Sequence, residues 1–199
     1  MNPTAPSVSL LPATLYRTMP WRNGRGTTTE IALGPSAGPD FAWRLSIADV
    51  PDSGPFSPFT GFERLIAVVA GAGMRLAVDG RPPATLDLHS PPYAFSGDAV
   101  TECTLVDGPI RDFNLIFDPA RATAVLTRWR GTDMPARVPL DGGTVLLHAL
   151  AGRLTVDAGP LGTWVVPEGD TLRLDRAAGT MMLAGDSGSH VLLARIAPH

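Results

Sequence analysis

The chain has 199 residues, of which 44% are apolar and 18% charged, and its formal net charge is -3. This length is enough for one large or two small compact units, each with a hydrophobic core. Since the charge is slightly acidic and no basic run occurs, we expect neither nucleic acid nor a membrane surface as a partner. A single cysteine, Cys103, excludes an internal disulfide framework and a Cys-based zinc cluster. No apolar run approaches a membrane span of about 20 residues and no signal peptide is visible, so we expect a cytoplasmic protein.

The N-terminal part of the chain contains two predicted irregular segments. Residues 1 to about 13 contain Pro and Ser, and we expect them to form a loose arm. Residues 19–30 read MPWRNGRGTTTE, and the two glycines indicate a tightly shaped loop that leads into a strand over 27–33. A polar loop before a strand often forms the rim of a pocket. A plain Gly-rich hairpin connection is the alternative interpretation.

Beyond this loop the apolar residues mostly follow the period of two that is typical of β-strands. The strand over 41–49 places Trp43, Leu45 and Ile47 on one face, and Arg44, Ser46 and Ala48 on the other. The strand over 111–117 places Phe113, Leu115 and Phe117 opposite Asp112 and Asn114. Further strands are predicted at 65–70, 74–79, 84–89, 101–106, 124–130, 145–151, 153–158, 163–166, 171–175, 180–184 and 190–197. With 20 prolines and 21 glycines, we expect no helix longer than about two turns.

A weak internal repeat relates the two halves of the chain. Residues 68–98 and 147–170 each contain an apolar strand, a Gly turn, an alternating strand and a small-Gly-Asp turn. This order is typical of a cupin-type β-barrel, or jelly roll, although chance similarity between two β-rich halves is the alternative. We therefore predict an all-β bicupin with two cupin-type β-barrels. The N-terminal barrel covers 14–120 and contains the presumed ligand pocket, and the mainly structural C-terminal barrel covers 121–199.

The sequence lacks the usual metal ligands of this barrel type. Many cupins bind a metal through a His-x-His pair, a downstream Glu and a later His. The corresponding segment 54–63 reads GPFSPFTGFE, and the chain's four histidines (His89, His148, His190 and His199) have no ligand spacing. We therefore expect no metal and no cofactor. The phenylalanines in this segment predict an apolar-walled pocket mouth.

The candidate ligand-binding residues lie in the first half of the chain. Arginine suits bidentate recognition of carboxylates, and Asn and Ser suit orientation of an amide or formyl oxygen. Alternatively, the polar faces of these strands simply point to water. The aromatic neighbours of Arg44 favour a covered location, where Glu30, Glu63, Asp112 or a ligand would supply the anionic partner. The predicted set is Asn23, Thr27, Glu30, Arg44, Ser46, Phe56, Phe59, Arg64, Asp112 and Asn114.

Four ordered segments resemble the HutD/Ves family: 21–27 with Glu30, 43–48, 54–64 and 111–114. The resemblance covers about 15–196, and one departure is Arg25, where the family pattern usually has glycine. The resemblance implies a bicupin fold without a bound metal in its usual site. It also implies an association with bacterial histidine utilisation, whose pathway includes formimino- and formylglutamate. HutD-like proteins are thought to bind such an intermediate and to restrain the pathway.

We therefore predict a protein that binds a small acidic metabolite, formylglutamate or a related intermediate, and that regulates or restrains bacterial histidine catabolism. The alternative is a metal-independent isomerase or hydrolase that uses Glu30, Glu63 or Asp112 as acid or base. A third hypothesis is a structural or protein-interaction module with an empty barrel. The sequence is also compatible with a homodimer.

Overall fold

The structure is a computed structural model that describes residues 5–21, 24, 26–37 and 40–199. Regular structure in these residues consists of β-strands and three single-turn 3-10 segments, Ala13–Leu15, Gly131–Asp133 and Gly159–Leu161. In the described part of the chain, no helix is long and apolar enough to cross a membrane. The fold is therefore all-β, as the period-two pattern predicts.

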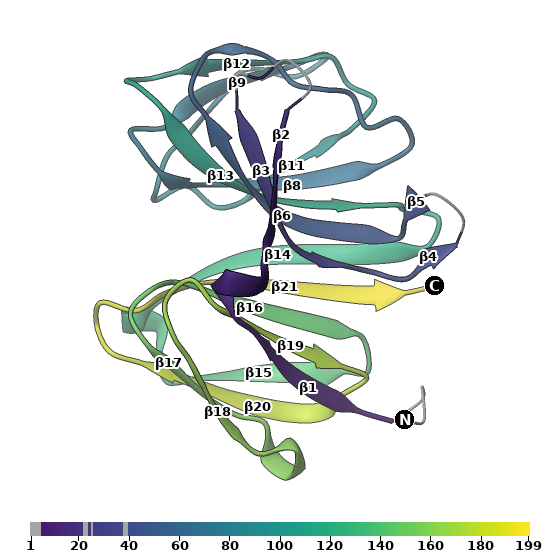
Figure 1. Cartoon of the computed structure of the whole chain (residues 1–199), viewed down its shortest axis with the longest axis vertical. Coiled ribbons are helices and arrows are strands. Elements are labelled where there is room, and N and C mark those ends of the chain that lie inside the picture. Colours follow the sequence, from purple (N-terminus) through teal and green to yellow (C-terminus); the bar gives the residue numbers. More distant parts are fainter. Residues whose placement is uncertain (1–4, 22–23, 25, 38–39) are drawn as a thin grey trace. The chain divides into compact units, whose positions relative to one another are not determined.

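Contacts divide the chain into two compact units. The N-terminal unit is Tyr16–Ala122, and the C-terminal unit combines Thr123–His199 with the segment that ends at Leu15. The strands of the N-terminal unit are β2 (Arg17–Pro20), β3 (Thr27–Leu33), β4 (Ser36–Ala37), β5 (Asp40–Phe41), β6 (Trp43–Val50), β7 (Gly54–Pro55), β8 (Glu63–Ala70), β9 (Met74–Val78), β10 (Ala84–Leu86), β11 (Tyr93–Ser96), β12 (Thr101–Leu105) and β13 (Ile110–Phe117). They form a six-stranded sheet in the order β11-β8-β13-β6-β3-β2, a four-stranded sheet in the order β10-β9-β12-β7, and the β4-β5 ribbon (Figure 1).

The C-terminal unit also contains two sheets. Its strands are β1 (Ser7–Leu11), β14 (Ala122–Arg130), β15 (Ala136–Asp141), β16 (Thr144–Ala151), β17 (Leu154–Asp157), β18 (Thr163–Val166), β19 (Thr171–Asp175), β20 (Ala178–Gly185) and β21 (His190–Pro198). One sheet has the order β1-β19-β16-β21-β14 and the other has the order β15-β20-β17-β18.

The first strand corrects one expectation, since the described part of the N-terminal segment is not a loose arm. β1 pairs antiparallel with β19, from Ser7 opposite Asp175 to Leu11 opposite Thr171. Val8 and Leu10 alternate along β1 and pack against the C-terminal core. The open edge of β19 offers unpaired backbone N–H and C=O groups, and β1 satisfies them. Only two apolar residues alternate in this segment, which is too short a pattern to predict a strand from the sequence.

The internal repeat has a counterpart in the strand order. The runs β11-β8-β13-β6 and β10-β9-β12-β7 of the N-terminal unit correspond to β19-β16-β21-β14 and β18-β17-β20-β15. In both halves a glycine with positive φ follows the long apolar strand: Gly71 (φ 88°) after β8 and Gly152 (φ 71°) after β16. A side chain at either position would be strained, and each glycine permits the turn into the next strand.

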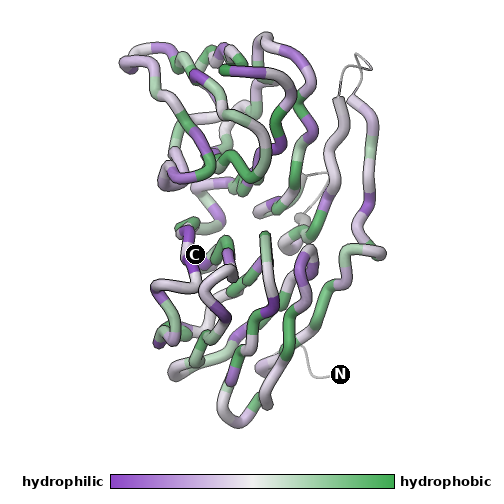
Figure 2. Tube along the Cα trace, turned by 90° about the vertical axis from the view of Figure 1, so that its left-hand side faces the viewer, coloured by the Kyte–Doolittle hydropathy of each residue, from purple (hydrophilic) through white to green (hydrophobic). Residues whose placement is uncertain are grey.

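Each unit has its own hydrophobic core. In the N-terminal unit the core includes Ile66 and Val68 of β8, Met74 and Leu76 of β9, and Phe95 of β11. In the C-terminal unit the largest core cluster draws on β15 to β21. The hydropathy changes over short intervals along the strands, as alternation between two faces requires (Figure 2).

Candidate functional site

The strand register places the polar residues of three strands on one face of the six-stranded sheet. Arg64 of β8 lies opposite Ile116 of β13, and Ile116 lies opposite Arg44 of β6. Asn114 of β13 in turn lies opposite Ser46 of β6. Because paired residues point to the same side of a sheet, both arginines, the asparagine and the serine share one face.

This face is the one that carries the N-terminal core. Asn114 lies opposite Ile66, and Asp112 lies opposite Val68, and both apolar residues belong to that core. Glu30 of β3 lies opposite Ser46 and therefore joins the same face. The interior side of the sheet therefore carries six predicted polar residues, namely Glu30, Arg44, Ser46, Arg64, Asp112 and Asn114. This contradicts the alternative that their face points to water.

Three phenylalanine rings surround the guanidinium of Arg64, which is only 6% exposed. Its Cζ atom lies 4.9 Å from the ring centroid of Phe95, 5.1 Å from that of Phe56 and 5.3 Å from that of Phe59. Burial lowers the pKa of Arg64 to about 10, partly offset by Asp112, so the guanidinium keeps its charge at neutral pH. Cation–π contacts offset part of the cost of burying this cation.

Arg44 lies beside the same aromatic cluster. Its Cζ atom is 5.2 Å from the ring centroids of both Phe41 and Phe59, so Phe59 contacts both guanidiniums. Burial lowers the pKa of Arg44, and the nearby Glu30 carboxylate opposes that shift. The buried Nε atoms of Arg44 and Arg64 have no hydrogen-bond partner. An anion that accepts hydrogen bonds from them would satisfy donors that the fold leaves unpaired.

A chain of hydrogen bonds extends from Arg64 into the core. Arg64 Nη2 donates to Asn114 Oδ1 over 2.8 Å, and Asn114 Nδ2 donates to Asp112 Oδ1. Asp112 is 1% exposed. Burial raises the pKa of Asp112 to about 7, while Arg64 and Asn114 counteract part of that increase. The carboxyl group therefore changes its protonation state near neutral pH.

The loop that carries Phe56 and Phe59 is anchored to the end of β11. The Phe59 amide donates to the Gly97 carbonyl over 2.9 Å, and the Gly97 amide donates to the Phe62 carbonyl over 2.7 Å. A Cβ atom at Gly97 would lie 2.3 Å from the Phe59 carbonyl oxygen. Gly97 is therefore required for the close approach that holds the Phe59 ring beside the arginines. The sequence showed the Ser-Gly-Asp turn but gave no signal of this role.

Three predicted participants do not join this cluster. Glu63 and Thr27 lie on the opposite face of their strands, because Glu63 pairs with Phe117 and Thr27 pairs with Asp49. Asn23 lies outside the described residues. In the opening loop, Trp21 Nε1 donates to Thr28 Oγ1 over 2.8 Å, which attaches the indole ring to β3.

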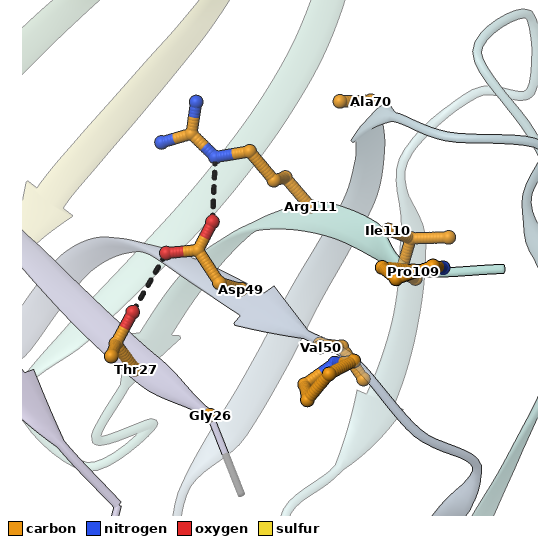
Figure 3. Close-up of a pocket in the computed structure, with 9 residues that line it drawn as sticks. Gly26, Thr27, Asp49, Val50, Ala70, Pro109, Ile110 and Arg111 are labelled. Atoms are coloured by element: carbon orange, nitrogen blue, oxygen red, sulfur yellow. Dashed lines mark hydrogen bonds and ion pairs between the residues drawn. The ribbon is translucent and has the colours of Figure 1, made fainter.

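A cavity of about 240 Å³ lies where β6 and β8 end and where β3 and β13 begin (Figure 3), and neither Arg44 nor Arg64 lines it. Its polar side is an ion pair of Arg111 Nε with Asp49 Oδ1 at 3.0 Å, and Thr27 Oγ1 donates to Asp49 Oδ2 over 2.7 Å. Both charged side chains are about half exposed, so the ion pair contributes little to stability. Of the predicted site residues, only Thr27 is among those that line it: Gly26, Thr27, Asp49, Val50, Pro51, Ala70, Pro109, Ile110 and Arg111.

Phe41 and Phe95 belong to the arginine cluster and were missed by sequence reasoning. Phe95 sits opposite Arg64 in the β11-β8 pair, but that pairing joins residues 31 positions apart and cannot be derived from local pattern. Within the described residues, no three His, Cys, Asp or Glu side chains form a group that could hold a metal ion. The cluster's chemistry is therefore that of an aromatic-lined cationic site with a buried carboxyl group behind it.

These features define an all-β protein of cupin-like fold with arginines on the interior side of a sheet. A cupin 2 conserved barrel domain protein from Leptotrichia buccalis is similar in fold, with a TM-score of 0.54 at 10% identity over 85% of this chain and 88% of that one.

The chain belongs to the HutD family, whose family model, described as HutD, matches residues 13–193. A Pseudomonas putida protein described as an uncharacterized 21.2 kDa protein in the hutC 3′ region is 47% identical over 150 residues, which cover 75% of this chain and 77% of the relative. Protein Ves from Citrobacter koseri is 41% identical over 48% of this chain and 50% of its own length. A solved structure of HutD from Pseudomonas fluorescens SBW25 is 38% identical, with a TM-score of 0.85 over 97% of this chain and 100% of that one. The HutD/Ves resemblance is thus confirmed.

Proposed function

We propose that the chain is a bicupin that binds a small acidic metabolite in its N-terminal unit and thereby restrains histidine catabolism in the bacterial cytoplasm. The observation that carries the proposal is the pair of arginines on the interior face of the six-stranded sheet. Their buried Nε donors have no partner. Three rings contact the Arg64 guanidinium, so a carboxylate there would be held in an environment of low dielectric constant, where charge-assisted hydrogen bonds are strong.

The two arginines also suggest the class of ligand. Both guanidiniums contact the Phe59 ring, which places two carboxylate-binding groups beside one apolar surface. Asn114 and Ser46 lie on the same face and offer polar groups that can orient an amide or formyl group. An acylated amino dicarboxylic acid such as N-formyl-L-glutamate has this set of groups. The relative in the hutC 3′ region and the HutD structure support a role in histidine utilisation.

Calorimetric titration with N-formyl-L-glutamate tests the proposal. We expect Arg44→Lys and Arg64→Lys each to lower the affinity roughly ten- to a hundredfold, because lysine lacks the planar fork and a charge-assisted contact contributes about 1.5–3 kcal/mol. The matched control is Arg111→Lys, whose arginine is half exposed on the other face of the sheet and should not affect binding. Thermal melts establish that each variant folds. Absence of binding to the wild type, or unchanged affinity in both folded site variants, would contradict the proposal.

One observation favours a second function, a metal-independent enzyme acting on the same class of metabolite. Asp112 is buried beside the arginine cluster, and its pKa of about 7 suits proton transfer at neutral pH. Nuclear magnetic resonance of N-formyl-L-glutamate incubated with the protein distinguishes the two functions. Turnover that disappears in Asp112→Asn would establish the enzyme, whereas saturable binding with an unchanged ligand supports the regulator.

A further inference from the structure

Asp112 is connected to the proposed anion site without facing it directly. The carboxyl group accepts a hydrogen bond from Asn114, whose amide oxygen accepts one from Arg64 over 2.8 Å. Through Asn114 the Arg64 guanidinium is therefore linked to a buried acid. The Nε atom of Arg64 is buried and has no hydrogen-bond partner, so it is the donor that the proposed ligand would satisfy.

The charged groups around Asp112 come from several strands. Arg64 on β8 is the principal cation, and it lowers the pKa of Asp112, while Asp49 on β6 raises it. Cys103 on β12 faces the same region, and burial raises its thiol pKa to about 11, so the thiol is neutral at physiological pH. The strand β9 contributes the apolar Met74 and Leu76 to this core, and β11 contributes Phe95 and the partly buried Tyr93.

Two further charges lie on the same face but farther along it. Arg44 pairs with Ile116, four residues from Asp112 along β13, and Glu30 interacts with Arg44. Arg64 is therefore the charge that principally favours the ionised form of Asp112, whereas burial favours the protonated form. Burial and Arg64 shift the pKa of Asp112 in opposite directions. A negative charge placed beside Arg64 therefore changes the protonation equilibrium of Asp112.

We propose that the N-terminal unit binds its anionic ligand together with a proton, which Asp112 takes up as the anion occupies Arg64. This inference rests on the proposed function. A ligand carboxylate at Arg64 offsets the positive charge that holds Asp112 ionised, so the bound state favours the neutral acid. By reciprocity, protonation of Asp112 strengthens anion binding by the same factor. The site then senses acidity as well as ligand concentration.

Calorimetry with N-formyl-L-glutamate in two buffers of different ionisation enthalpy counts the protons exchanged. The carboxyl groups of the probe have pKa values of about 4 or below, so the probe remains ionised between about pH 6 and pH 8.5. We expect net uptake of a fraction of a proton at about pH 7 to 8. We also expect roughly tenfold weaker affinity at about pH 8.5 than at about pH 6.

Two variants assign the proton. Asp112→Asn mimics the neutral acid, so its affinity should equal the low-pH affinity of the wild type at every pH, with no proton uptake. Glu30→Gln is the matched control, because it removes a negative charge from the same face beside Arg44. It should strengthen binding similarly at both pH values and retain the proton uptake.

The possible failures are distinguishable. If the wild type binds the probe with the same affinity across this pH range and exchanges no proton, the proton coupling is wrong and the proposed function stands. Uptake that persists in folded Asp112→Asn assigns the proton to another group and also overturns the inference. If the wild type binds no probe at either pH, both proposals fail. Should Asp112→Asn not fold, the proton count of the wild type decides.

Discussion

Asn114 is the residue whose replacement should most clearly reveal the internal polar chain. Asn114→Leu keeps the number and branching of the side-chain heavy atoms but removes the acceptor for Arg64 and the donor for Asp112. Each hydrogen bond to a charged group contributes about 1.5–3 kcal/mol, and breaking both leaves two buried groups without this partner. We therefore expect the free energy of unfolding to fall by roughly 3–5 kcal/mol, a large part of the roughly 5–15 kcal/mol typical of a folded protein.

Urea unfolding, followed by tryptophan fluorescence and far-ultraviolet circular dichroism, measures this loss. The matched control is Thr101→Val, which removes a buried hydroxyl group whose bond to the Ala99 carbonyl, over 3.0 Å, is local. That variant should lose only about 1 kcal/mol. If Asn114→Leu were no more destabilising than Thr101→Val, the chain from Arg64 to Asp112 would make no special contribution and the electrostatic reasoning would be refuted.

Three further predictions concern the buried acid, the aromatic loop and the first strand. Burial raises the pKa of Asp112 from 3.8 in the unfolded chain to about 7 in the folded protein. As the pH rises, the unfolded chain releases this proton first, so the free energy of unfolding of the wild type should fall as the pH increases from about 4 to about 7. Asp112→Asn should lack this decline and exceed the wild type by up to about 4 kcal/mol above pH 7, and parallel pH profiles in thermal melts would contradict this. Gly97→Ala should displace the Phe59 loop and weaken N-formyl-L-glutamate binding several-fold in calorimetry, whereas wild-type affinity would separate that loop from the site. Deletion of residues 1–11 removes β1 and exposes the β19 edge. Urea unfolding should then show that the free energy of unfolding of the C-terminal unit has fallen by roughly 2–4 kcal/mol. Unchanged stability would refute the structural role of β1.

Local sequence pattern was sufficient for most of the strands. The alternation over 41–49 and 111–117 predicted both the strands and their faces, because neighbouring side chains on a strand point to opposite sides whatever lies around them. Arg44, Ser46, Asp112 and Asn114 were placed on polar strand faces for that reason, and the register confirms their common face. The prediction omits β15, although its burial alternates without interruption, because a proline such as Pro139 inside a short run argues against a strand.

The assembly of the site was decided by tertiary structure. Which strands become neighbours depends on pairings between distant segments, such as β8 with β11 and β13, and no local pattern specifies them. The pairings brought Phe95 to Arg64 and left Glu63 and Thr27 on the other face. Burial likewise exists only in the folded chain. The sequence determined that a carboxyl group stands at position 112, whereas the surrounding core determined that its pKa lies near 7, because only the fold removes it from water.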